Sequence, residues 1–355
     1  MKTKTIIKSS LILLLALLLT GSVFSAPKGD FTKPIKKEFN IDKGATLNIN
    51  CEFSDIKAFN WNKDIISIEV NITVDAKNED KAADKFDNVI VELSGNTSEV
   101  KLRTGIESSF FGNNNNNIDV EVVIYYPSHI QLELNTEFGN SIFEDIEGKV
   151  NIELDYGNFT AHNLTNTELN LDVEFGQIEV NRFQAGEVEV SYGGFTSKVA
   201  GALKLESAFS SNEIDQVEHL ELSSAYDKIF IGQANIALIE TEFSNLRIDQ
   251  LNSHLKLETA YGSFRLGKIA TDFEMIDINA EFTGVELSFT ENASFAFQVT
   301  MDMGDFKYPK DQMHITKLEK EMMELYLEGY MGNAKGSAPK VILDVEHANA
   351  KIQIQ

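Results

Sequence analysis

The sequence predicts an all-β protein built around a parallel β-helix-like solenoid of about nine coils. Aromatic residues recur 17 to 19 residues apart, with 21 before the last, and a short turn containing glycine or asparagine follows most of them. A fixed period of this size is typical of repeat proteins, whose units bury a core only by stacking. The recurring residues alternate between Phe and Tyr: Phe138, Tyr156, Phe175, Tyr192, Phe209, Tyr226, Phe243, Tyr261 and Phe282.

Each repeat shows the period of two that marks a β-strand. With the aromatic residue as position zero, positions −6, −4 and −2 are apolar or small, as in Leu169, Leu171 and Val173. Alternate residues lie on one face of a strand. Apolar residues resume at +3 and +5, as in Ile178 and Val180, so each coil has a longer and a shorter strand. Extending the alternation to position zero places the rings inside, and we expect an internal aromatic ladder.

The first 37 residues contain two segments that we expect to lie outside the fold. Residues 1–25 have a lysine-containing start, an apolar stretch too short to span a bilayer comfortably and small residues before Ser25. These are the features of a cleaved signal peptide. Residues 26–37 contain two prolines and several lysines, which predicts a flexible leader.

The remaining chain divides into three predicted parts. Residues 38–128 read as an N-terminal β region with a short helix over 78–86 and an exposed loop at the five asparagines 113–117. Residues 129–292 contain the repeats. The aromatic phase is lost over 293–355, so we expect a C-terminal β cap there, because the open end of a solenoid needs cover.

Charge and composition limit the classes of partner. The formal charge is −24, and removing Lys2, Lys4 and Lys8 with the signal peptide makes it −27. Nucleic acids and anionic lipids both require clustered cations, which argues against them. No second apolar stretch is long enough to span a membrane. We therefore expect export across the inner membrane to the periplasm, the outer cell surface or the extracellular space.

Three features carry a resemblance to a known family. They are the run Trp61-Asn-Lys-Asp-Ile-Ile-Ser-Ile-Glu-Val70, the strand that ends at Pro127, and the repeats with glycine turns. Together they resemble the bacterial "putative adhesin" β-solenoid family over about residues 38–290. The resemblance implies a right-handed β-helix-like fold in a secreted or envelope protein, and it supplies no catalytic residues.

The outward positions of the longer strand form an acidic face. Positions −5, −3 and −1 together contain fifteen carboxylates and only two lysines, Lys204 and Lys256. Such a face could bind calcium or a basic partner, or could simply be a solvated surface that keeps the solenoid soluble. The sequence contains no dedicated calcium motif. The central column of possible cation ligands is Glu153, Asp172, Glu189, Glu206, Glu240 and Glu258.

The pattern favours binding over catalysis. The six histidines are dispersed, and no nucleophile elbow or phosphate-binding glycine loop occurs. We expect no cofactor and a non-enzymatic adhesin-like or scaffolding protein with a protein or glycan partner. The alternatives are a carbohydrate-active β-helix enzyme, either a polysaccharide lyase or a hydrolase, and a periplasmic structural or envelope-stress protein. A groove with paired carboxylates and exposed aromatic rings would favour the enzyme.

Overall fold

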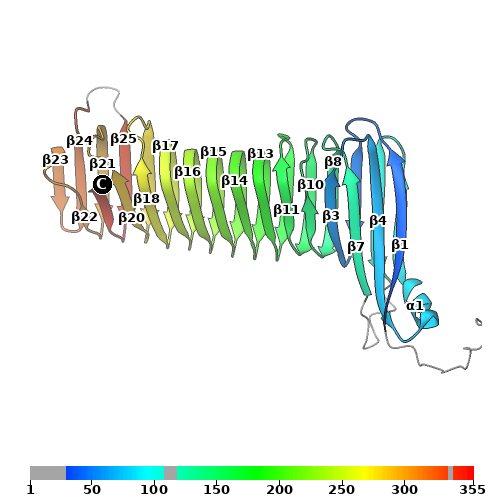
Figure 1. The fold of residues 1–355 in the computed structure, drawn as a ribbon. Helices are drawn as coiled ribbons and strands as arrows, with labels where there is room; N and C mark the ends of the chain where they lie inside the picture. Colours follow the sequence, from blue (N-terminus) through cyan, green and yellow to red (C-terminus); the bar gives the residue numbers. More distant parts are fainter. Residues whose placement is uncertain (1–28, 108–117, 335–338) are drawn as a thin grey trace, which may run out of the picture.

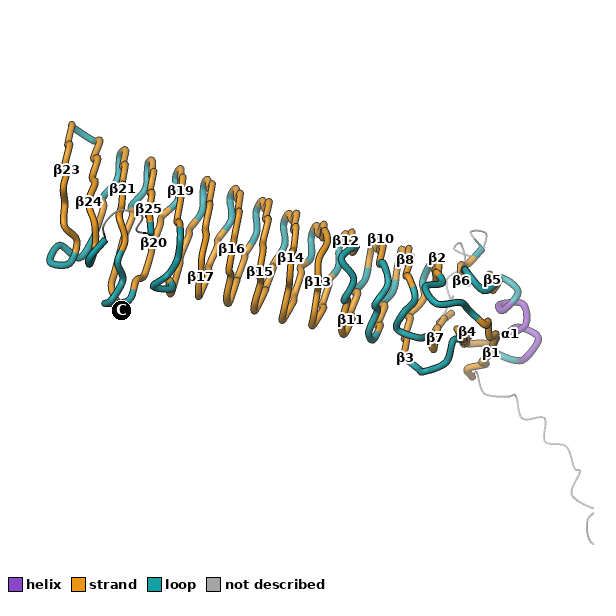
Figure 2. The backbone as a smooth tube through the Cα atoms, turned by 90° about the horizontal axis from the view of Figure 1, so that it is seen from above, coloured by secondary structure: helices purple, strands orange, loops and turns teal. Residues whose placement is uncertain are grey.

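The computed structural model describes residues 29–107, 118–334 and 339–355, and the chain winds into a long flattened stack of coils (Figures 1 and 2). Two layers of strands enclose the core. The solenoid fold expected from the repeats is confirmed. The expected signal peptide and the asparagine run lie outside the described residues. Among the described residues, no helix is long and apolar enough to cross a membrane.

The first layer contains the longer strand of each repeat, and the second layer contains the shorter one. Neighbouring strands pair in parallel, and the aligned positions of successive repeats face each other, as in Leu154 opposite Val173. Each of the strands β13 to β17 is continuous and bends from the second layer into the first. The strands are β8 (Gln131–Phe138), β9 (Ser141–Phe143), β10 (Val150–Tyr156), β11 (Phe159–Leu164), β12 (Leu169–Glu174), β13 (Gln177–Ser191), β14 (Gly194–Ala208), β15 (Ser211–Ala225), β16 (Lys228–Glu242), β17 (Asn245–Ala260), β18 (Ser263–Ile269), β19 (Met275–Glu281) and β20 (Gly284–Phe289).

The core lies between the two layers, and the predicted alternation of the strands is confirmed. Leu169, Leu171 and Val173 of the first layer are buried opposite Ile178 and Val180 of the second. Burying one such aliphatic side chain stabilises the folded state by about 1.5–3 kcal/mol. Because every coil repeats these positions, the solenoid has one continuous apolar interior.

The N-terminal region contains a coil of the same kind. β2 pairs in parallel with β8, and β3 pairs in parallel with β9, so both stack directly on the repeats. Cys51 at the end of β2 is buried, and this burial raises the pKa of its thiol to about 11. The region contains β1 (Gly29–Asn40), β2 (Thr46–Cys51), β3 (Ser54–Asn60), β4 (Ile65–Ala76), α1 (Glu79–Phe86), β5 (Val89–Gly95), β6 (Glu99–Ile106) and β7 (Ile118–Tyr126).

The expectation of a flexible leader over residues 26–37 is wrong from Gly29 onward. β1 pairs antiparallel with β4 along its whole length, and Phe31 and Ile35 pack against the core. Lysines and Pro34 made this stretch look mobile, but both are typical of edge strands, where they block further pairing. In the described structure β1 pairs only with β4, so it is an edge of this kind.

The C-terminal part covers the end of the stack and then returns into it. β25 lies between β19 and β21 and pairs in parallel with both. The antiparallel hairpin β23–β24, which precedes β25 in the chain, covers β21 at the end of the molecule (Figure 1). The strands are β21 (Phe295–Asp302), β22 (Phe306–Lys307), β23 (Met313–Glu321), β24 (Glu324–Met331), β25 (Lys340–Glu346) and β26 (Ala350–Ile354).

The aromatic rings stack as a ladder, but the expectation that they lie inside is wrong. The chain turns sharply at each ring, and from Phe175 to Phe282 the aromatic residue itself has a positive φ, between 48° and 62°. This left-handed conformation ends the alternation of the strand and turns the side chain outward. At Phe138 and Tyr156 the glycine that follows, Gly139 or Gly157, has the positive φ instead. The period-two rule therefore fails at the corner.

Candidate functional site

The predicted acidic column exists as one aligned row on the outer face of the first layer. Glu153 pairs with Asp172, Asp172 with Glu189, and Glu189 with Glu206 in successive strands. Ser223 occupies the next rung, and Glu240 and Glu258 continue the row. All six carboxylates are exposed. Rungs of a parallel sheet are about 4.8 Å apart, so the row combines high charge with close spacing.

Two lysines neutralise part of this row. The Nζ of Lys204 lies 3.0 Å from a carboxylate oxygen of Glu206 and 3.6 Å from one of Glu187. The Nζ of Lys256 lies 2.7 Å from Glu258. Within the described residues, Glu189 and Glu240 make no ion pair or side-chain hydrogen bond. These two carboxylates therefore remain available to a basic partner.

Asp172 lies in the most strongly acidic part of the row. Partial burial raises the pKa of its carboxyl, and the neighbouring charges of Glu174, Glu153 and Asp155 raise it further. Like charges on adjacent rungs disfavour ionisation because each lies in the field of the others. Lys204 lies two rungs from Asp172 and Lys256 five, and neither forms an ion pair with it, so this stretch keeps its repulsion.

The row does not form a compact metal cluster. Over the residues that the structure describes, no group of three or more His, Cys, Asp or Glu side chains is arranged to hold a metal ion. Carboxylates pointing outward from separate strands supply few ligands to any one point, whereas calcium needs six to eight oxygens. The cation-binding role of Glu153, Asp172, Glu189, Glu206, Glu240 and Glu258 thus stays a prediction.

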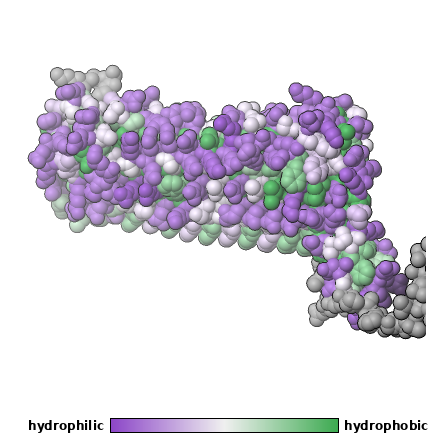
Figure 3. All heavy atoms as spheres, viewed as in Figure 1, coloured by the Kyte–Doolittle hydropathy of each residue, from purple (hydrophilic) through white to green (hydrophobic). Residues whose placement is uncertain are grey.

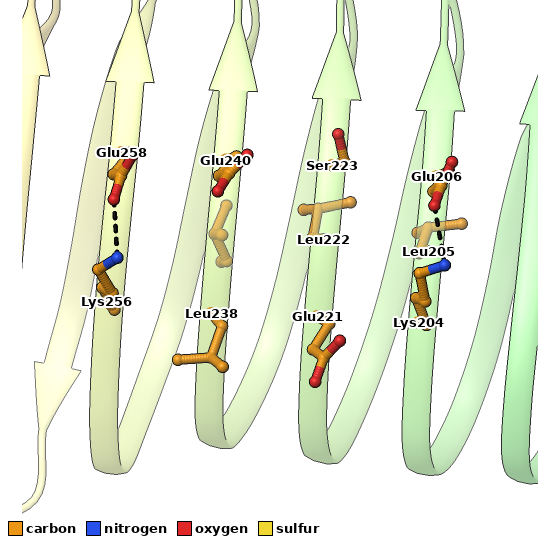
Figure 4. A pocket seen from close by; sticks show the side chains of 11 residues that line it. Lys204, Leu205, Glu206, Glu221, Leu222, Ser223, Leu238, Glu240, Lys256 and Glu258 are labelled. Carbon is orange, nitrogen blue, oxygen red and sulfur yellow. Dashed lines mark hydrogen bonds and ion pairs between the residues drawn. The ribbon is translucent and has the colours of Figure 1, made fainter.

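A shallow hollow lies in the acidic face where the column contains Ser223. One part, of about 370 Å³, is lined by Lys204, Glu221, Leu238 and Lys256 together with residues of the column (Figure 4). A second part, of about 450 Å³, shares Glu206, Ser223 and Glu240 with the first. It continues over Ser191, Ala208 and Ala225 at position −1. The hollow exists because small side chains occupy positions that hold glutamate in other coils, such as Glu174 and Glu242.

The aromatic ladder borders this acidic face. Eight successive ring pairs from Phe138 to Phe282 have centroids 4.8–5.0 Å apart and planes within 8° of parallel. The rings are between 38% and 53% exposed. Figure 3 shows a mostly hydrophilic face with a row of apolar residues along its lower margin, where the arrows of β13–β16 end in Figure 1. We call the nine predicted rings the aromatic ridge.

The ridge continues beyond the nine rings that the repeat pattern identified. Phe53 stacks on Phe138 with centroids 4.8 Å apart, and His347 stacks on Phe282 at 4.6 Å. Sequence reasoning missed both because their coils are separated from the repeats by long insertions. Their signal is the same, an aromatic residue that follows an alternating strand: Phe53 is two residues after β2, and His347 comes directly after β25.

Carboxylates and exposed rings together are the features that would favour a carbohydrate-active enzyme, but their geometry differs from such a site. A sugar stacks on the face of a ring, and in the ridge each face contacts the next ring, which leaves ring edges toward solvent. A catalytic carboxylate must also be held in place. Glu206 is held only by Lys204, and Glu240 makes no side-chain contact of this kind in the described structure.

A family model described as Toastrack DUF4097 matches residues 45–326. No curated protein matches the chain. Similar solved structures include a "putative cell adhesion protein" from Clostridium sporogenes, with 10% identity, 91% of this chain and 100% of the other covered, and a TM-score of 0.21.

Two further structures show similarity at the same level. A "putative adhesin" from Parabacteroides merdae has 12% identity, with 72% of this chain and 96% of the other covered, and a TM-score of 0.30. A "putative lipid binding protein" from Parabacteroides distasonis has 11% identity, with 90% and 96% covered, and a TM-score of 0.26.

Proposed function

The chain belongs to the Toastrack DUF4097 family, and on that premise we propose that it is a non-enzymatic binding or scaffolding protein of the cell envelope. Its acidic face would bind a cationic partner. The observation that carries this proposal is the aligned row from Glu153 to Glu258, in which Glu189 and Glu240 form no ion pair within the described residues.

The rigidity of the solenoid supports a binding role. The carboxylates project from paired strands, so their spacing is set by the backbone before any partner arrives. A preorganised row loses little conformational entropy on binding, and its summed field attracts a cation from a distance. Such an interaction is expected to weaken with salt, since the Debye length falls to about 8 Å at physiological ionic strength.

Binding of a labelled decalysine peptide tests this function. The variant Glu189→Gln/Glu206→Gln/Glu240→Gln removes three charges from the acidic face. Each charge at an exposed contact contributes about 0.5 kcal/mol, so the affinity should fall about tenfold. The control Glu179→Gln/Glu213→Gln/Asp215→Asn removes the same charge from exposed positions of the second layer.

The control variant should change the affinity less than about twofold, because its charges lie on the other side of the solenoid. Equal losses in the two variants would mean that decalysine responds to net charge alone, and the acidic face would then not be a binding surface. No measurable binding by the parent protein at low salt would also overturn the proposal.

A further inference from the structure

The aromatic ridge is most exposed where it meets the hollow. Tyr192, Phe209 and Tyr226 are 53%, 51% and 51% exposed, and Tyr261 follows at 48%. Position −1 before these four rings is occupied by Ser191, Ala208, Ala225 and Ala260, whereas a carboxylate residue precedes each of the other five rings of the ridge. Small neighbours uncover the ring edges, because a glutamate at position −1 would lie against them.

An apolar path crosses the face from the ridge toward the opposite edge of the first layer. It starts at the edges of Phe209 and Tyr226 and passes over Ala225 and Ser223. It ends near Leu238, which is 41% exposed and lines the hollow in Figure 4. Charged side chains stand on both sides of the path, with Glu206 toward β14 and Glu240 toward β16. The surface is therefore amphipathic, with an apolar floor and carboxylates on both sides, and Lys204 and Lys256 lie at the end near Leu238, where they pair with Glu206 and Glu258.

We propose that this surface is a docking site for a basic amphipathic segment of a protein partner. The inference rests on the proposed function and specifies its partner. Apolar side chains of the segment would contact the ring edges and Leu238, and lysine or arginine side chains would pair with Glu189 and Glu240. Charge complementarity selects this occupant, because a basic segment meets carboxylates that form no ion pair in the described structure.

Other occupants fit the same surface less well. An anionic lipid surface would face the repulsion of the carboxylates on both sides. A glycan would contact only ring edges and could not stack on the ring faces, since neighbouring rings cover these faces. A second copy of the chain would bring a formal charge of −24 toward an equal charge. A short extended segment laid along the strands meets both the apolar floor and the carboxylates.

Two decapeptides of equal charge separate the apolar contribution from the electrostatic one. The first alternates lysine with leucine, and the second alternates lysine with serine. The lysine–leucine peptide should bind at least about tenfold more tightly, because leucine contacts with the ridge remove apolar surface from water. Affinity is measured by fluorescence anisotropy on the purified protein at fixed salt.

The variant Ala208→Gln/Ala225→Gln fills the floor of the hollow without changing charge. Glutamate already occupies this register position in neighbouring coils, as Glu174 and Glu242, so the fold accommodates long side chains there. The variant should abolish the preference for the lysine–leucine peptide. The matched control is Ala260→Gln, which has the same register position beyond the hollow and should keep the preference.

The outcomes distinguish this inference from the function on which it rests. Equal affinity for both peptides, unchanged by Ala208→Gln/Ala225→Gln, would overturn the docking site and leave the acidic binding face intact. Failure of both peptides to bind would overturn the proposed function as well. If sedimentation showed a dimer of the parent protein that the double variant dissociates, the occupant would be a second copy and the inference would be wrong.

Discussion

The imidazole of His347 stacks on the ring of Phe282 with centroids 4.6 Å apart and planes 10° from parallel. The chain forms β20 to β25 between these two residues, yet His347 occupies the next rung, and the backbone N–H of Phe282 donates a hydrogen bond to the carbonyl of Glu346. His347 also has the positive φ of the ridge corners, 56°. The inserted coil therefore reproduces the corner geometry of the repeats.

His347→Phe should stabilise the protein by about 0.5–1 kcal/mol, because a phenyl ring extends the stack with a larger apolar edge. His347→Ala should destabilise it by a similar amount. Urea unfolding measures both. The control His219→Phe places the same ring at an exposed strand position outside the ridge. A gain from His219→Phe equal to that from His347→Phe would contradict the stacking explanation.

Substitution by glycine rather than alanine should affect stability in opposite directions at Phe209 and Phe138. Phe209 has a φ of 53°, which glycine adopts without strain, so Phe209→Gly should be about 1 kcal/mol more stable than Phe209→Ala. Phe138 has no positive φ, and there the glycine variant should be less stable than the alanine variant by about 0.5–1 kcal/mol. Both alanine variants lose stacking and should unfold at lower urea concentration than the parent. The same order at both sites would contradict the corner model.

Asp172→Asn should raise stability at neutral pH. Because folding raises the pKa of this carboxyl above its ordinary value of 3.8, the folded state binds the proton more readily, and stability falls as pH rises through that window. The exposed position limits the gain from asparagine to less than about 1 kcal/mol at pH 7. The gain should disappear below the ordinary pKa, which urea unfolding at several pH values would show.

The pKa of Glu286 is shifted in the opposite direction to that of Asp172. A hydrogen bond from Lys351 lowers the pKa of Glu286, which contributes stability above its ordinary pKa, and that stability is lost as pH falls through the lowered value. Glu286→Gln should therefore be destabilising at neutral pH and neutral in acid. If the two variants showed the same pH dependence, the local charge assignments would be wrong.

Asp227 should be essential to the corner beneath the ridge. Its buried carboxylate accepts hydrogen bonds from the hydroxyls of Ser207 and Ser224 and from the backbone N–H of Ser210, the last at 2.6 Å. Asp227→Ala leaves these donors buried without an acceptor and should destabilise the protein by about 2–4 kcal/mol. Asp215→Asn, at an exposed position, is the control. Equal urea midpoints for the two variants would contradict this role.

The sequence determined the repeats, the strand faces and the acidic row, because each depends on a local period that neighbouring coils copy. Leu169, Leu171 and Val173 are buried as expected, and Glu153 through Glu258 align as expected. The helix expected over 78–86 occurs as α1. These features follow from the geometry of a single strand or turn and need no knowledge of distant contacts.

Only the tertiary structure decided where the rings point and which distant segments join the stack. The sign of φ at a corner such as Phe175 depends on how consecutive coils close, and it reversed the expected direction of the ring. The coil that contains Phe53, the coil that ends at His347, and the pairing of β1 with β4 all join residues separated by long stretches of chain. Local alternation does not encode such pairings, because hydrogen bonds between strands form wherever two edges meet in space.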